Sequence, residues 1–350
     1  MENQYLQFQR VVRLWSKEGN SEKSKAFFSP SYFFPRHANI EFYIGKLNAE
    51  RINSGTNKTD GYRYLLISED SMKVIKAELE LYISIKISST PTDYNATSYE
   101  DIKPIIIDSQ EAYEKIEMSL LKFKKSVKKK AKAARANAKL KSIRDSLEKA
   151  REMYQENKYL FVAIDVESYE RDHSCILEVG WSMYNAKSNL FMDRHFCATE
   201  YEHMRNGRFV PDMKERFIFG ETIWTNLKSI ADEFVKDLTE EGVKGNVVLV
   251  GHDIKMEEKY LENMGVEIQK VIKPVGRFDT AEMNAARLGN PHERMALGKI
   301  LDSLDIENYS LHNAGNDARY TLLLFLELCK FPLASLKEFP QTSDSDEEES

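Results

Sequence analysis

The sequence predicts an α/β protein in which a small α+β domain and a long basic helix precede a larger domain. The larger domain is expected to hold a mixed sheet flanked by helices. Three observations support this: strand-length apolar runs in the second half, helical apolar periodicity after them, and no Gly or Pro between residues 108 and 157. The chain of 350 residues also exceeds the roughly 250–300 at which a single core stops growing.

Residues 1–107 are expected to form the small α+β domain. Apolar and polar residues alternate over 40–44, 62–67 and 79–85, which predicts strands with one solvated face. No catalytic arrangement of residues is evident in this part, so its role is unassigned. A protein partner could bind here or on the long helix.

Residues 108–157 are expected to form one long amphipathic helix. Asp108 and Glu111 have the spacing of a capping box, and apolar residues recur at helical spacing afterwards. Lys122 to Arg144 contains many cations and no acid.

Three interpretations of this basic segment stay open. It is a solvated connector, a binding site for nucleic-acid phosphates, or a segment that contacts an anionic membrane surface. The residues that would hold phosphates are Lys124, Lys125, Lys128, Lys129, Lys132 and Arg135.

Residues 158–334 are expected to form the α/β domain, and residues 335–350 an acidic, disordered tail. The predicted strands are 159–164, 175–184, 190–198 and 246–250. The predicted helices are 223–238, 258–264, 295–304 and 318–329.

Asp165 and Glu167 follow the first buried strand of this domain. They are two residues apart on an extended segment, so both side chains leave the same face. Two carboxylates this close repel each other and favour a bound cation, and oxygen ligands favour Mg²⁺ or Mn²⁺.

His312 and Asp317 lie at a later junction between a loop and a helix. From there Asp317 can join a metal site at the sheet edge, and His312 can take a proton from a metal-bound water. A further carboxylate follows the strand 246–250, either Glu257 or Asp253, although Asp253 would also serve as a helix cap.

Together, Asp165-x-Glu167, Gly251-His252 and His312-x-Ala314-x-x-Asp317 resemble the three motifs of DEDDh-class 3′→5′ exonucleases, which are ribonuclease H-like. Asn206-Gly207-Arg208-Phe209, Phe217-x-Phe219-Gly220 and Arg277-Phe278-Asp279-Thr280 are similar to the fungal Gfd2-like branch. The resemblance covers residues 158–330. It implies a sheet with antiparallel leading strands, two divalent cations, Mg²⁺ or Mn²⁺, and removal of nucleotides from a DNA or RNA 3′ end.

Carried over by motif position, the resemblance gives Asp165, Glu167 and Asp317 as metal ligands and His312 as the general base. Glu257 occupies the place where the class has Asp and is one methylene longer. Asp253 is the alternative ligand. Because of this departure, a second function stays open, in which the domain is an inactive nuclease fold that binds nucleic acid or protein.

Composition restricts the location and the class of protein. No stretch reaches the ~20 apolar residues of a membrane span, and Met1 to Trp15 lacks an apolar signal core. Three widely spaced cysteines fit a reducing compartment. A nuclear or cytoplasmic protein is expected, with an organellar location left open.

Overall fold

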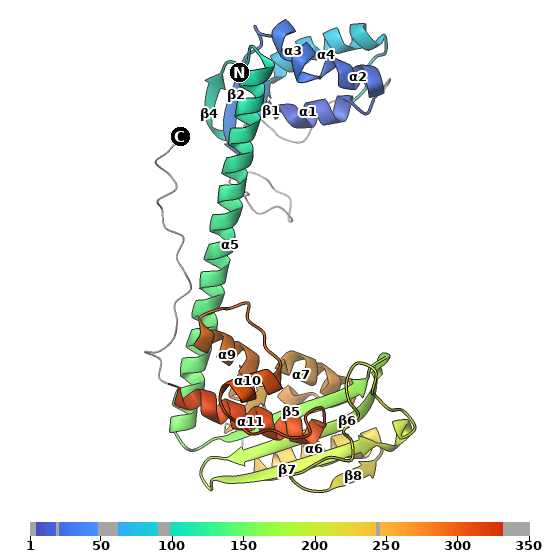
Figure 1. The fold of residues 1–350 in the computed structure, drawn as a ribbon, viewed down its shortest axis with the longest axis vertical. Coiled ribbons are helices and arrows are strands. Elements are labelled where there is room, and N and C mark those ends of the chain that lie inside the picture. Colours follow the sequence, from blue (N-terminus) through green and yellow to red (C-terminus); the bar gives the residue numbers. More distant parts are fainter. Residues whose placement is uncertain (1–4, 19–20, 48–61, 90–98, 243–245, 332–350) are drawn as a thin grey trace. The chain divides into compact units, whose positions relative to one another are not determined.

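The computed structural model describes residues 5–18, 21–47, 62–89, 99–242 and 246–331. The chain divides into two compact units, 1–133 and 134–350, and the division falls within the long helix α5 (Gln110–Gln155). The tail expected to be disordered, 335–350, lies outside the described residues. Figure 1 shows both units, with most of their helices and strands labelled.

The first unit holds an antiparallel sheet in the order β1-β3-β2-β4. Its elements are β1 (Tyr5–Gln7), α1 (Phe8–Trp15), α2 (Ser21–Phe27), α3 (Pro30–Arg36), β2 (Phe42–Leu47), β3 (Arg63–Ser68), α4 (Glu69–Ile83) and β4 (Tyr99–Ile105). The prediction of a strand at 79–85 was wrong, because most of that segment is the end of α4. Met72, Ile75, Leu79 and Ile83 are its buried residues, at helical spacing.

Helix α5 starts one residue later than the predicted capping box requires, at Gln110. Ser109, and not Asp108, caps it, because the Ser109 hydroxyl accepts from the amide of Ala112 at 3.2 Å. Its first turns pack on the first unit's core through residues such as Tyr113 and Ile116. Its last turns belong to the second unit's core, in which Leu140, Ile143, Leu147, Ala150 and Met153 are buried.

The second unit is built on a six-stranded mixed sheet in the order β10-β9-β5-β6-β7-β8. Strands β5, β6 and β7 are antiparallel, whereas the pairs β5–β9, β9–β10 and β7–β8 are parallel. The strands are β5 (Leu160–Tyr169), β6 (Asp172–Asn185), β7 (Leu190–Ala198), β8 (Thr222–Thr225), β9 (Val247–Gly251) and β10 (Gly276–Asp279). The predicted mixed α/β, ribonuclease H-like fold is thereby confirmed.

Helices cover both faces of this sheet (Figure 1). They are α6 (Leu227–Glu241), α7 (Ile254–Asn263), α8 (Ile268–Val271), α9 (Thr280–Leu288), α10 (Leu297–Ser303) and α11 (Ala314–Lys330). The helix expected over 223–238 starts later, because 222–225 pairs with β7 as β8.

The central strand β5 separates the two cores. Phe161 and Ala163 face α9, α10, α11 and the end of α5, whereas Val162 and Ile164 face α6 and α7. This alternation fixes the direction of the residues that follow, since side chains leave a strand on alternate faces. Asp165 and Glu167 therefore continue the α11 face. No helix among the described residues is both long and apolar enough to cross a membrane.

Candidate metal and nuclease site

The end of β5 supplies the first two candidate ligands. In the register with β6, Asp165 lies opposite Gly180 and Glu167 lies opposite Glu178. The register shifts immediately after Glu167. The two carboxylates therefore lie at the last regular positions of this pairing, on the face covered by α11.

Two glycines allow α11 to start directly on the sheet. A Cβ atom on Gly180 would overlap the main chain of Ala314 and Gly315. A Cβ atom on Gly315 would lie 2.6 Å from Phe217 and 2.7 Å from His195. Real Cβ atoms do not approach this closely, so both positions require glycine. The contact brings Asp317, in the first turn of α11, to the end of β5.

His312 lies just before α11, in a left-handed backbone conformation with φ 66°. Its amide donates to Oδ2 of Asp317 at 3.1 Å, while its side chain is exposed. One ligand atom from each of Glu167, His312 and Asp317 lies within 4.8 Å of the others. The structure thus places the predicted base beside two of the predicted ligands.

Glu257 is the fourth acid of this cluster. It lies in the first turn of α7, is only 7% exposed, and accepts a hydrogen bond from the amide of Val166, between Asp165 and Glu167. The alternative, Asp253, is half exposed and faces Arg294, with a nitrogen–oxygen distance of 3.8 Å. Of the two residues that the sequence offered, the structure brings Glu257 to the other acids.

His252, from the middle motif, connects neighbouring segments through both of its ring nitrogens. Its Nδ1 hydrogen-bonds with the hydroxyl of Thr280 at 2.8 Å, and its Nε2 with the carbonyl of Met295 at 3.0 Å. Burial lowers the pKa of His252, which keeps the ring neutral. It joins the end of β9 to α9 and to the segment before α10.

The four acids interact strongly with one another. Burial, followed by the charges of Glu257, Asp317 and Glu167, holds the pKa of Asp165 well above its usual range. Burial and neighbouring carboxylates raise the pKa of Glu167 to about 8 and that of Glu257 to about 8. Burial raises the pKa of Asp317 to about 7, although the amide of His312 opposes the shift. Such a cluster is stable in its ionised form only with compensating positive charge.

Two of the acids also have oxygens without a protein partner. Oε2 of Glu257 and Oδ1 of Asp317 are buried and accept no hydrogen bond from the described residues. Buried carboxylate oxygens normally have partners. Divalent cations that prefer oxygen ligands, such as Mg²⁺ and Mn²⁺, fit both the unpaired oxygens and the surplus negative charge.

A buried polar network supports this cluster, and the sequence did not reveal it. Nε2 of His195 lies 3.0 Å from Glu178 and Nδ1 lies 2.9 Å from the hydroxyl of Thr222. Glu178 also accepts from the amide of Ala314 at 3.4 Å. Asn313 caps α11 through the amide of Asn316 and donates to the carbonyl of Met213 at 3.0 Å. These bonds hold the His312–Asp317 segment against β6 and β7.

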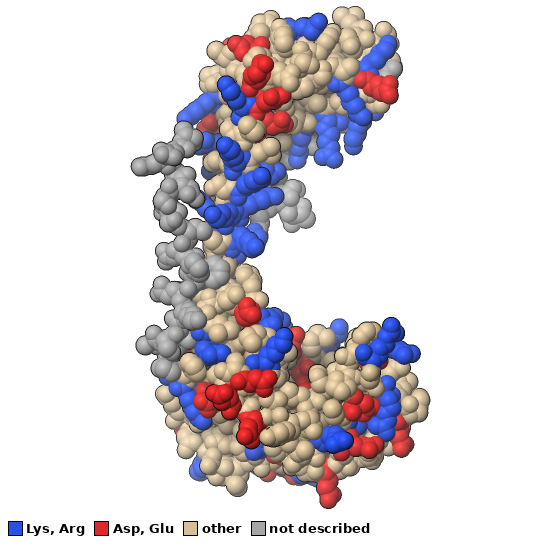
Figure 2. All heavy atoms as spheres, in the orientation of Figure 1, with Lys and Arg blue, Asp and Glu red and all other residues tan. Residues whose placement is uncertain are grey.

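The predicted phosphate-binding residues lie on the middle of α5. Lys125, Lys128, Lys129, Lys132 and Arg135 are exposed, and Lys124 is half-buried with its Nζ 5.0 Å from the ring centre of Tyr62. Figure 2 shows lysine and arginine side chains gathered along this part of the helix. The segment from 121 to 135 contains no buried residue, so it faces solvent.

Comparison with known proteins agrees with this arrangement. Residues 160–328 match the family model DEDDh_C, described as DNA polymerase III subunit epsilon-like, C-terminal domain. The chain is 34% identical over 181 residues to the uncharacterised nucleolar protein C2C4.08 of Schizosaccharomyces pombe, covering 50% of this chain and 71% of that protein.

Two proteins of Saccharomyces cerevisiae are also similar. The uncharacterised protein YDR514C is 30% identical over 206 residues, which is 51% of this chain and 42% of that protein. Good for full DBP5 activity protein 2 is 27% identical over 212 residues, which is 52% of this chain and 38% of that protein. The matches thus span less than half of these two relatives.

The fold, the order of the acidic motifs and the family model define a DEDDh exonuclease-like domain. The chain belongs to this family, together with the fungal Gfd2-like proteins.

Proposed function

We propose that the second unit is a 3′→5′ exonuclease that hydrolyses the terminal phosphodiester of DNA or RNA with two divalent cations. The observation that carries the proposal is the convergence of four acids, two of which have buried oxygens without a partner among the described residues. A structural acid cluster would have evolved partners for those oxygens, because unpaired buried charge is strongly destabilising.

Asp165, Glu167, Glu257 and Asp317 would hold the cations. When bound, divalent cations lower the pKa of a water and neutralise the charge that develops on the phosphate and on the leaving oxygen. The protein's own contribution is to fix the carboxylates in place, through the amide of Val166 on Glu257 and the amide of His312 on Asp317.

His312 would accept the proton of the attacking water. Its side chain is exposed at the open side of the cluster, and its main chain is fixed by the bond to Asp317. Imidazole accepts protons near neutral pH, and a positioned general base contributes typically 10²–10⁴-fold in rate.

The direct test uses 5′-labelled single-stranded DNA and RNA with Mg²⁺ or Mn²⁺. We expect stepwise shortening from the 3′ end, and a rate about 10²–10⁴-fold lower for His312→Ala. His292→Ala, in an exposed histidine outside the cluster, is the matched control and should retain full rate. Binding of the strand without any shortening by the wild-type protein would instead favour a nucleic-acid binding module.

Glu257→Asp tests the departure from the family pattern. The shorter side chain withdraws the carboxylate from the Val166 amide and from the other acids, so we expect a rate at least tenfold lower. Single-turnover kinetics at saturating Mn²⁺ would measure it. A faster Glu257→Asp enzyme would show that the longer side chain costs activity in this chain.

The basic segment of α5 is proposed to bind the strand outside the cluster. Replacing Lys124, Lys125, Lys128 and Lys129 by Ala preserves a helix-favouring sequence and removes four positive charges. We expect weaker binding to single strands. The plot of the logarithm of the binding constant against the logarithm of salt concentration should also become less steep, by about 0.7 for each lost phosphate contact. Lys115→Ala with Lys149→Ala is the control. An unchanged salt slope in the fourfold variant would exclude this role.

A nuclear location is proposed as well. It is supported by the similarity to the nucleolar S. pombe protein C2C4.08.

A further inference from the structure

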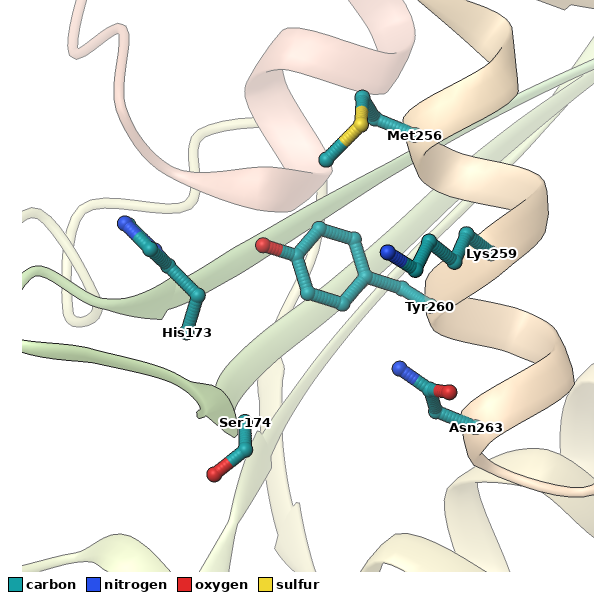
Figure 3. A pocket seen from close by; sticks show the side chains of 6 residues that line it. All are labelled: His173, Ser174, Met256, Lys259, Tyr260 and Asn263. Carbon is teal, nitrogen blue, oxygen red and sulfur yellow. The ribbon is translucent and has the colours of Figure 1, made fainter. Parts of the chain in front are cut away.

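A cavity of about 250 Å³ lies between α7 and the start of β6. Its lining residues are His173, Ser174, Met256, Lys259, Tyr260 and Asn263. Figure 3 shows Lys259, Tyr260 and Asn263 projecting from α7 toward His173 and Ser174. None of these residues has a role in the cluster of acids described above.

Hydrogen bonds fix the inner wall of this cavity. The hydroxyl of Ser168 lies 2.9 Å from Nδ1 of His173 and 3.0 Å from the hydroxyl of Tyr260. Ser168 thereby ties the β5–β6 hairpin to α7 and orients the Tyr260 ring along the cavity. These contacts fix α7 and the β5–β6 hairpin relative to each other at the cavity wall.

The cavity is close in sequence to the acids on two elements. Ser168 directly follows Glu167 on β5, and Met256 directly precedes Glu257 on α7. At 1.5 Å per helical residue, Tyr260 and Asn263 lie about 4–9 Å further along α7 than Glu257. A nucleotide in the cavity would thus be the immediate neighbour of a phosphate held at the acids.

The lining has the chemistry of a nucleotide site. Lys259 is exposed and, within the described part of the chain, forms no ion pair with an acid. Ser174 and Asn263 offer polar groups for hydrogen bonds, while the Tyr260 ring and the Met256 side chain offer apolar surface for a base. A cation for phosphate beside an aromatic ring for stacking is the usual combination in single-strand binding.

The lysine also indicates which nucleotide binds. The 3′-terminal nucleotide carries only the phosphate that would be cleaved, and that phosphate lies at the acids. The nucleotide on its 5′ side carries a second phosphate, which needs a positive partner of its own.

We propose that this cavity binds the nucleotide on the 5′ side of the cleaved phosphodiester, with Lys259 on its 5′ phosphate and Tyr260 on its base or sugar. The assignment rests on the exonuclease function proposed above. It makes the preferred substrate an unpaired 3′ end of at least three nucleotides, since the Lys259 contact requires an internal phosphate.

Two probes separate the cavity from the acids. Fluorescein-labelled oligothymidylate occupies both, whereas the p-nitrophenyl ester of thymidine 5′-monophosphate has the terminal nucleotide and no 5′ neighbour. Lys259→Ala should raise KM for the oligonucleotide about 5- to 20-fold and leave kcat/KM for the ester unchanged. Lys259→Arg should restore most of the loss. Lys228→Ala, in an exposed lysine of α6, is the charge-matched control.

Equal losses on both probes, or no loss on the oligonucleotide, would overturn the assignment. If the wild-type protein cleaves neither probe, the proposed exonuclease function fails, and the cavity is judged by fluorescence anisotropy of the same oligonucleotide in Ca²⁺. Weaker binding by Lys259→Ala than by Lys228→Ala would then still support a nucleotide site. Equal binding by the two variants would reject it.

Discussion

Asp165→Asn is expected to abolish exonuclease activity and, in the absence of metal, to stabilise the protein. Asp165 interacts with the charges of Glu257, Asp317 and Glu167, so its replacement removes a source of repulsion together with the proposed metal ligand. We expect a rate lower by about 10³-fold or more, as for other preorganised charge-stabilising groups. A ligand that costs stability and supports catalysis is typical of active sites.

The stabilisation should depend on pH with a defined sign. An acid whose folded-state pKa is raised binds its proton more tightly when folded, so stability falls as pH rises toward that pKa. The pKa of Asp165 is raised well above its usual range, and those of its neighbours Glu167 and Asp317 are raised to about 8 and about 7. The advantage of Asn over Asp should therefore grow as the pH rises above about 4, the ordinary pKa of an aspartate. Thermal unfolding of metal-free protein at pH 5 and pH 9 would measure it.

Two controls make this result specific. Asp172→Asn alters an exposed acid of the same hairpin. It should leave the exonuclease rate unchanged and should not produce a gain in melting temperature that grows with pH. Mn²⁺ should raise the melting temperature of the wild-type protein, because a ligand that binds only the folded state stabilises it. It should raise that of Asp165→Asn much less. Lower metal-free stability in Asp165→Asn would mean that the carboxylate has a structural role.

Gly180→Ala should cause the largest loss of stability among single methyl additions in this domain. The new Cβ would overlap the backbone of Ala314 and Gly315, and a backbone cannot move aside as a flexible side chain can. We expect a cost of about 3 kcal/mol, which is roughly a 6–12 °C lower melting temperature for a domain of this size. Displacing the start of α11 also displaces Asp317, so the exonuclease rate should fall.

Gly298→Ala is the matched control. Gly298 lies inside α10, where alanine favours the helix, and its new Cβ would meet only the end of the Leu311 side chain at 2.8 Å. Differential scanning calorimetry should show little change for this variant. If Gly180→Ala unfolds within 1–2 °C of the wild-type protein (roughly half a kcal/mol), α11 does not depend on this contact.

Much of the site followed from local sequence signals. Asp165 and Glu167 were predicted to share a face because strand geometry dictates it, and the register of β5 agrees. The position of Asp317 followed from its place at the start of a helix after a loop. Glu257 and Asp253 could not be separated by sequence, because both lie near the start of α7. The structure separates them, since helical geometry turns Glu257 toward Val166 and leaves Asp253 beside Arg294.

Other features depend on contacts that sequence spacing does not reveal. Glu178 and His195 lie on different strands, and only the β6–β7 pairing brings them together. The role of Gly180 could not be predicted from the sequence around it. It depends on close packing against the start of α11, which lies far along the chain. The apolar alternation of the segment 79–85 by itself is typical of a strand, whereas Met72 and Ile75 complete the helical period of α4. Strand β10 is short, with only Gly276–Asp279, and was not predicted.

The most direct measurement is a Mn²⁺ titration of 3′-nucleotide release from a 5′-labelled single strand by the wild-type protein and Asp165→Asn. We predict a single-nucleotide ladder whose rate rises with Mn²⁺ and saturates for the wild-type protein, and no ladder above background for Asp165→Asn. Both proteins should still bind the strand through α5. Metal-independent shortening, or equal shortening by both proteins, would contradict a nuclease site built on these acids.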